Sequence, residues 1–302
     1  MKVSADDERL RLDKFIRRSL PRAPLNFIFQ SIRKGDINVN GKKARQDYRL
    51  KEGDEIIFSF PAEKYLLSQK PSAFKQRFTV LYEDADLLAV DKPAGLASHG
   101  GTGIEDSLIA EVRAYLKDTE GRSSLAHRLD RETSGVVLIG KNKTFLRMLN
   151  AALQERTVNK TYQALTAGRF SKRHGTLVSS LKRVQENFST KIIVDPSGKE
   201  ARLSYNVLKE YPMFSMIEIT LHTGRMHQIR AQLAADGHHV LGDKVYGNIS
   251  LNKKLKTELL YLHAHRIQFT HPRTGKYLKL VSPLPEAFQK FLRKMQALIL
   301  SP

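Results

Sequence analysis

The chain has 302 residues, of which 41% are hydrophobic and 27% charged, so it can bury a normal core and is not a disordered chain. Its length suits two domains better than one. The formal net charge of +20 favours a polyanionic partner, either nucleic acid or an anionic membrane surface. Apolar runs such as Val136–Ile139 are strand-sized, far short of the roughly 20 residues of a membrane span. The absence of cysteine excludes disulfides, thiol catalysis and cysteine-ligated zinc.

The N-terminal quarter is the denser basic region. A first helix is predicted from apolar residues at helical spacing with arginine and lysine between them: Leu10, Leu12, Phe15, Ile16 and Leu20. A second helix carries Phe27, Ile28 and Ile32 and ends at Gly35, a usual residue after a helix. Short strands are expected at 37–40 and 54–58. Residues 8–62 therefore read as a small α+β module, suited to binding and too small for an enzyme core.

A proline- and lysine-containing linker is expected at 63–77, followed by a second domain at 78–298. No secretory signal follows Met1 and the opening is acidic, so a cytoplasmic protein is the expectation. Because strands outnumber helices without regular alternation, the second domain is predicted to be α+β with a mixed sheet. The expected strands are 78–82, 87–90, 135–140, 161–167, 201–209, 214–222, 261–269 and 277–281, and the expected helices are 105–117, 144–155 and 229–235.

Asp130 stands in a polar stretch between a short apolar lead and a buried strand. The arginines that flank it, Arg128 and Arg131, favour the ionised carboxylate that a nucleophile or a base requires. The same residue could simply stabilise its own turn through an Asx hydrogen bond. From the residues alone both interpretations stay open.

A second polar cluster, residues 221–230, lies between a strand and a predicted helix. It gathers two arginines, two histidines and a glutamine around Gly224. Hydrogen-bond donors at a helix N-terminus suit anion or RNA contact, although a solvated basic turn has the same composition.

Other candidate sites carry less weight. Residues 135–141 have Walker A spacing, but Asn142 replaces the magnesium-binding Ser/Thr and the intervening residues are branched and apolar, so a buried strand is expected. The stretch His99–Gly103 could hold a phosphate or form an empty turn. The pairs His263/His265 and His238/His239 lack a third ligand, so no metal site is predicted.

The first module resembles the S4-type RNA-binding domain. The similarity is carried by Arg33–Lys42 (RKGDINVNGK) and Gly53–Ile56 (GDEI). A generic basic mini-domain is the alternative. The resemblance implies that six basic residues face RNA phosphates: Arg9, Arg11, Arg33, Lys34, Lys42 and Lys43.

The second domain resembles the RluA-type pseudouridine synthases. His127–Gly135 (HRLDRETSG) matches that family's signature, and other family motifs follow in order, at 91–95, 160–162, 223–230, 242–247 and 262–272. With the S4-type module the similarity covers about residues 8–295, and it is strongest to the ribosomal large-subunit synthase C branch. Gln232 and His239 depart from the usual His and Pro, which puts substrate preference in doubt more than activity.

The resemblance implies a role for each matching residue. Asp130 would act on the ribose as nucleophile or base, Arg230 would hold it ionised and aimed, and Tyr162 would pack against the uracil and help to remove its C5 proton. Arg128 would fill the space that a flipped base vacates. Further RNA contacts would come from Arg131, Lys160, Arg225, His227 and Gln228.

The implied reaction isomerises uridine without net redox change, so neither a cofactor nor a metal is expected. The implied partner is RNA, most simply ribosomal RNA, bound by a monomer without a membrane. Three other classes of protein share part of this pattern: a non-catalytic ribosome-associated RNA-binding protein, an aspartate-dependent glycosidase and a metal nuclease. The first leaves the large second domain without a purpose, the second usually needs another carboxylate, and the third needs a carboxylate cluster.

Overall fold

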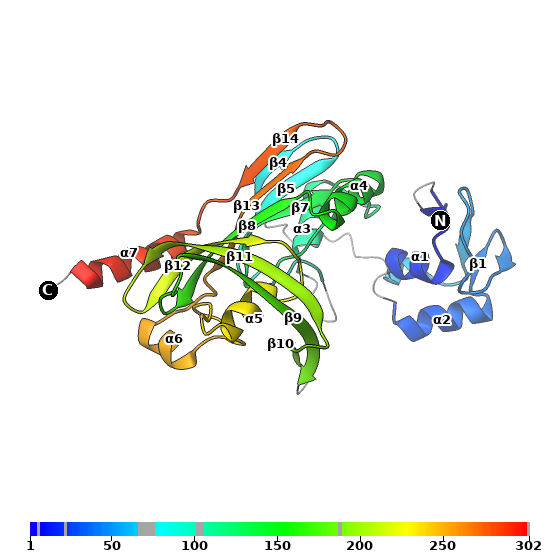
Figure 1. The fold of residues 1–302 in the computed structure, drawn as a ribbon. Coiled ribbons are helices and arrows are strands. Elements are labelled where there is room, and N and C mark those ends of the chain that lie inside the picture. Colours follow the sequence, from blue (N-terminus) through cyan, green and yellow to red (C-terminus); the bar gives the residue numbers. More distant parts are fainter. Residues whose placement is uncertain (5–6, 21–22, 66–75, 101–105, 187–188, 301–302) are drawn as a thin grey trace. The chain divides into compact units, whose positions relative to one another are not determined.

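The computed structural model describes residues 1–4, 7–20, 23–65, 76–100, 106–186 and 189–300. The chain divides into two compact units, Met1–Phe74 and Lys75–Pro302, and each is described by itself (Figure 1). Most of the expected linker and residues 101–103 of the His99–Gly103 stretch lie outside the described residues. No helix within the described ranges is long and apolar enough to cross a membrane.

The first unit packs two helices on a small antiparallel sheet. The helices are α1 (Leu12–Ser19) and α2 (Leu25–Lys34), and the strands β1 (Ile37–Val39), β2 (Lys42–Lys43) and β3 (Ile56–Phe58) lie in the order β2-β1-β3. The apolar residues that suggested the helices from sequence form the core, with Leu12, Ile16 and Ile28 fully buried. Gly35 ends α2 with φ 93°, a left-handed conformation that glycine adopts without strain. The 3-10 helix η2 (Ala62–Tyr65) packs against the same core.

The second unit is built on an 11-stranded mixed sheet. Its main path runs β10-β9-β11-β12-β8-β13-β7-β5-β4, with β14 beside β13 and β6 beside β7. The strands are β4 (Thr79–Glu83), β5 (Leu87–Lys92), β6 (Ser124–Leu125), β7 (Ser134–Gly140), β8 (Asn159–Ala167), β9 (His174–Glu186), β10 (Ser189–Val194), β11 (Lys199–Glu210), β12 (Phe214–Leu221), β13 (Leu262–Thr270) and β14 (Tyr277–Val281). The helices are α3 (Leu108–Tyr115), α4 (Lys143–Gln154), α5 (Gln228–Ala235), α6 (Ile249–Leu255) and α7 (Glu286–Leu300).

Helices cover both faces of this sheet (Figure 1). Strand β7 is buried throughout, and its residues alternate between two cores. Val137 and Ile139 join the cluster that contains α3 and α5, whereas Val136 and Leu138 join the cluster that contains α4. This two-sided burial explains why β7 reads as a continuous apolar run rather than as an alternating strand.

One junction in the middle of the sheet is parallel. There β13 pairs with β7 through His263–Ser134 and Ala264–Gly135, whereas the other strand pairs are antiparallel. Gly135 has φ 116°, and a Cβ at this position would collide with the backbone of Ala264. Only glycine fits this close approach. The loop that enters β7 is thereby fixed at the centre of the sheet.

The predicted α+β fold with a mixed sheet is confirmed. The expected strands of the second domain are all present, although α3 is shorter than the helix expected at 105–117. The sequence prediction missed the hairpin of β9 and β10 and the helices α6 and α7. The hairpin was missed because its strands are polar and partly exposed, so they lack the apolar alternation that marks a half-buried strand.

Candidate active site

Asp130 lies in the loop between β6 and β7, and the neighbouring residues of this loop are anchored on both sides. The backbone of buried Leu129 is held by Ser98, whose Oγ donates to the Leu129 carbonyl at 2.6 Å and accepts from its N–H at 3.1 Å. On the other side, the Gly95 N–H donates to the Arg131 carbonyl at 2.9 Å. The turn itself is closed by the backbone, with the Thr133 N–H donating to the Asp130 carbonyl. The carboxylate of Asp130 is therefore left for other partners.

Lys92, the last residue of β5, also holds the Asp130 loop in place. Its side chain is fully buried, and Nζ donates to the carbonyls of Pro93, Leu96 and Arg131 at 2.8–3.0 Å. Burial lowers the pKa of Lys92 to about 8, although the negative charges of Glu132 and Asp130 act in the opposite direction. Because one ammonium group bonds three carbonyls on two segments, it ties the end of β5 to the Asp130 loop.

Arg230, near the start of α5, pairs with Asp130 across 100 residues of sequence. Its Nη1 donates to Asp130 Oδ2 at 3.0 Å, while Nε and Nη2 bond both oxygens of Asp243 at 2.7 and 2.8 Å. Burial alone would lower the pKa of Arg230, but Asp243 and Asp130 raise it overall. Burial would likewise raise the pKa of Asp243, yet its bonds to Arg230 and to backbone N–H groups lower it. The guanidinium is thus fixed by one carboxylate and presented to the other.

His227 also faces Asp130. Its Nε2 lies 3.8 Å from Asp130 Oδ2, and its Nδ1 is 3.0 Å from the Tyr246 hydroxyl. Burial lowers the pKa of His227, opposed by the charge of Asp130, so the neutral ring is favoured at neutral pH. The Tyr246 ring in turn lies under the Arg230 guanidinium, at 5.1 Å from its central carbon. These contacts place His227 beside the carboxylate and not among the exposed basic residues.

Tyr162 lies on β8, opposite Ile219 of β12. Its side chain is buried, and burial together with the negative charge of Asp130 raises its pKa. A tyrosine in this state keeps its proton at neutral pH and is a poor base. Lys160, two residues earlier on the same strand, is partly buried, and burial lowers its pKa.

Gln228 and Gln232 form a buried amide pair that connects α5 to the sheet. Gln228 accepts from the Thr223 hydroxyl and the Arg225 N–H and donates to Arg202 and Gln232. Gln232 donates to the Ala201 carbonyl and the Ser179 hydroxyl. Both the oxygen and the nitrogen of the Gln228 amide are hydrogen-bonded within the protein, and the side chain is only 2% exposed. This environment suits a positioning role better than an RNA contact. The residue that departs from the family pattern, Gln232, thus bonds α5, the helix that carries Arg230, to strands β9 and β11.

The other predicted RNA contacts are side chains on the surface. Arg128, Arg131 and Arg225 of the second unit are exposed, and Arg225 Nε donates to the Glu200 carbonyl at 3.2 Å. In the first unit Arg11 is engaged by Asp13, whereas the remaining five are exposed: Arg9, Arg33, Lys34, Lys42 and Lys43. Within the second unit the structure thus brings Asp130, Tyr162, Arg230 and His227 together, and Arg128 stands two residues before Asp130 on the same loop.

Three further residues shape the site without having been given roles from sequence. Asp243, Tyr246 and Lys92 stood inside recognised motifs, but their partners are distant in the chain. A buried arginine needs a second carboxylate, and this requirement could have pointed to Asp243 once Arg230 was placed inside. Within the described ranges, no three or more His, Asp or Glu residues gather as a metal-binding group would.

The chain is similar to known proteins over nearly its whole length. The profile of the RNA pseudouridylate synthases matches residues 86–235, and that of the S4 domain matches residues 10–56. A ribosomal large subunit pseudouridine synthase C from Buchnera aphidicola subsp. Schizaphis graminum is 35% identical over 97% of this chain and 96% of its own length. The protein of the same name from Escherichia coli K12 is 32% identical over 97% and 95%.

The fold also has a counterpart among solved structures. Human RNA Pseudouridylate Synthase Domain Containing 4 superposes with a TM-score of 0.59 at 23% identity, covering 72% of this chain and 92% of its own. That likeness concerns the fold alone, whereas the identity to the bacterial relatives extends over nearly the whole chain. The chain belongs to the RNA pseudouridine synthase family and carries an N-terminal S4 domain.

Proposed function

We propose that this enzyme converts specific uridines of large-subunit ribosomal RNA to pseudouridine, with Asp130 as its catalytic residue. The observation that carries the assignment of Asp130 is its ion pair with Arg230, which aims a half-buried carboxylate from a loop anchored on both sides. The substrate is supported by the bacterial relatives, whose names specify the large ribosomal subunit. The S4 domain and the charge of +20 fit a polyanionic substrate of this kind.

The reaction conserves atoms and electrons. The C1′–N1 bond breaks, the uracil rotates, a C1′–C5 bond forms, and the proton lost from C5 is balanced by one gained at N1. Asp130 can begin this sequence by attacking C1′ or by taking a proton from C2′, and both routes require its carboxylate. Arg230 orients that carboxylate, and Asp243 and Tyr246 hold Arg230. His227 lines the same side of the carboxylate as a neutral group.

Tyr162 is assigned to packing against the uracil. Its raised pKa argues against the phenolate that would be needed to remove the C5 proton. A buried aromatic ring on a central strand is nevertheless a rigid surface for a planar base. We therefore assign Tyr162 to packing, and its part in removing the C5 proton stays a prediction.

A uridine in a folded RNA must leave its stack before it can reach Asp130, at a cost of a few kcal/mol. Arg128 is exposed two residues before Asp130, on the same anchored loop. A guanidinium plane can stack on the bases that flank the flipped uridine. We therefore assign Arg128 to the space that this uridine leaves in the RNA stack. Arg131 and Arg225 are assigned to the flanking phosphates.

The test is Asp130→Asn, measured by tritium release from ribosomal RNA labelled at uridine C5. The amide keeps the shape but cannot act as nucleophile or base, so turnover should fall by at least about a thousandfold while the Kd for RNA changes by less than about twofold. Glu132→Gln, on the exposed end of the same turn, is the matched control and should retain activity. Near wild-type turnover in Asp130→Asn would falsify the assignment.

A further inference from the structure

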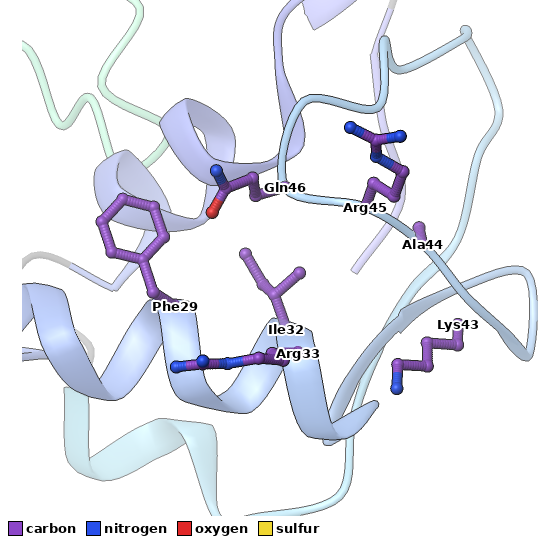
Figure 2. A pocket seen from close by; sticks show the side chains of 7 residues that line it. All are labelled: Phe29, Ile32, Arg33, Lys43, Ala44, Arg45 and Gln46. Carbon is purple, nitrogen blue, oxygen red and sulfur yellow. The ribbon is translucent and has the colours of Figure 1, made fainter.

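The S4 domain contains a groove beside its basic surface. The groove has a volume of about 550 Å³ and lies between α2 and the segment that follows β2. Figure 2 shows Phe29 and Ile32 rising from α2 toward the segment 44–46. Its lining residues are Phe29, Ile32, Arg33, Lys43, Ala44, Arg45 and Gln46. Pockets of this size accommodate small planar ligands.

The apolar lining of the groove contains an aromatic ring that the domain core does not use. Ile32 is buried, whereas Phe29 is only half-buried. Phe27, by contrast, contacts the rings of Phe60 and Tyr65. Among the described residues Phe29 has no such ring partner, so its ring remains available to a ligand.

The rim is cationic. Arg33 and Lys43 are exposed and have no acidic partner in the described part of the chain. Arg45 pairs with the exposed Asp47 at 3.3 Å and with no other acidic residue that the structure describes. Gln46 adds a side-chain amide, which can both donate and accept hydrogen bonds. An aromatic surface flanked by cations and an amide has the chemistry to hold a base, its phosphates and one polar base edge.

We infer that this groove takes the base of an unstacked nucleotide, with the adjoining phosphates on Arg33 and Lys43. The inference rests on the proposed RNA substrate and assigns to the S4 domain a structural preference in addition to charge. Paired RNA offers phosphates but no free base face. A bulged or unpaired nucleotide offers both, so the domain recognises a local break in the helix.

The test uses the full-length protein and two RNA hairpins, one fully paired and one with a single bulged 2-aminopurine. Wild-type protein should bind the bulged hairpin roughly tenfold more tightly, as expected from base–aromatic stacking, and should quench the 2-aminopurine fluorescence. Phe29→Ala should lose both the preference and the quenching while its salt dependence stays unchanged. Phe29→Trp should keep the preference, and Leu25→Ala, an exposed apolar residue of the same helix outside the groove, is the control.

The outcomes separate this inference from the proposed function. Equal affinity of the wild-type protein for the two hairpins overturns the groove assignment, even if uridine isomerisation still depends on Asp130. A preference that persists in Phe29→Ala also overturns it, because the base then binds elsewhere. Failure of the wild-type protein to bind either RNA overturns the groove assignment and counts against the RNA substrate as well. Thermal unfolding of Phe29→Ala and Phe29→Trp checks that the domain remains folded.

Discussion

Exposed cations of the S4 domain differ in their surroundings from two buried cations of the catalytic unit. In the S4 domain Lys34 and Lys42 are exposed and lack acidic partners among the described residues. In the catalytic unit Lys92 and Arg230 are buried, and each is surrounded by acceptors. An exposed cation attracts RNA over a distance set by salt, whereas a buried cation fixes geometry. The positive charge of this chain therefore serves two purposes that can be separated by mutation.

The largest difference is expected in how much stability is lost when a buried ion pair of the catalytic unit and an exposed ion pair of the S4 domain are broken. The side chain of Asp243 is fully buried against Arg230, whereas the side chains of Arg45 and Asp47 are 88% and 51% exposed. Asp243→Ala leaves a buried guanidinium without its main partner and should lower the free energy of unfolding of the catalytic unit by about 3–5 kcal/mol. Asp47→Ala should cost less than about 1 kcal/mol in the S4 domain.

Urea unfolding followed separately for each unit measures both effects. Asp243→Asn preserves the shape and one acceptor oxygen and is expected to fall between the wild type and Asp243→Ala. If Asp243→Ala and Asp47→Ala destabilise their units equally, then burial does not distinguish these pairs and the comparison fails.

An effect of intermediate size is expected on the pH dependence of stability, through protonation of Lys92. Its pKa is about 8 in the folded protein, against an ordinary value of 10.5. Between these values the unfolded chain binds more protons than the native state, so this group's contribution to stability rises with pH. The contribution is complete above pH 10.5 and is lost as the pH falls through 8. Its full size is on the order of 3 kcal/mol.

The measurement compares wild type with Lys92→Met from pH 7 to pH 10. Lys92→Met loses three carbonyl bonds and should be less stable throughout, but wild type should gain stability relative to it as pH rises above 8. Lys34→Met, which replaces an exposed lysine of the S4 domain by the same side chain, is the matched control for the loss of one positive charge. Parallel stability curves for wild type and Lys92→Met would show that Lys92 is not titrating in this range.

Local sequence patterns account for the elements of the fold better than for the contacts of the site. The apolar spacing of α1 and the continuous run of β7 reflect burial of neighbouring residues, so a single segment contains the signal. The resemblance to a known family pointed to Asp130, Tyr162 and Arg230, and the structure places all three around one site. No local pattern indicated that Lys92 would reach the Arg131 carbonyl.

Polarity alone also misleads about Gln228. A glutamine among arginines and histidines suggests contact with RNA. In the structure, however, its side-chain amide is hydrogen-bonded to Thr223, to the Arg202 carbonyl of β11 and to Gln232 of α5. A short motif gives residue types and spacing, whereas exposure depends on strands that are distant in sequence. Tertiary pairing decides whether a polar side chain faces the substrate or supports a residue that does.

The smallest effect is expected at the exposed lysines of the S4 domain and concerns the salt dependence of binding. Replacing both Lys34 and Lys42 with Ala removes two phosphate contacts if these side chains face RNA. The slope of log Kd against log salt should then decrease by roughly 0.7–0.9 per lysine, with little change in protein stability. The matched control is Lys290→Ala, an exposed lysine of α7 that pairs with Glu286 at 2.9 Å. An equal change in slope for this control would mean that RNA senses the net charge of the whole chain and that the S4 domain supplies no specific phosphate contacts.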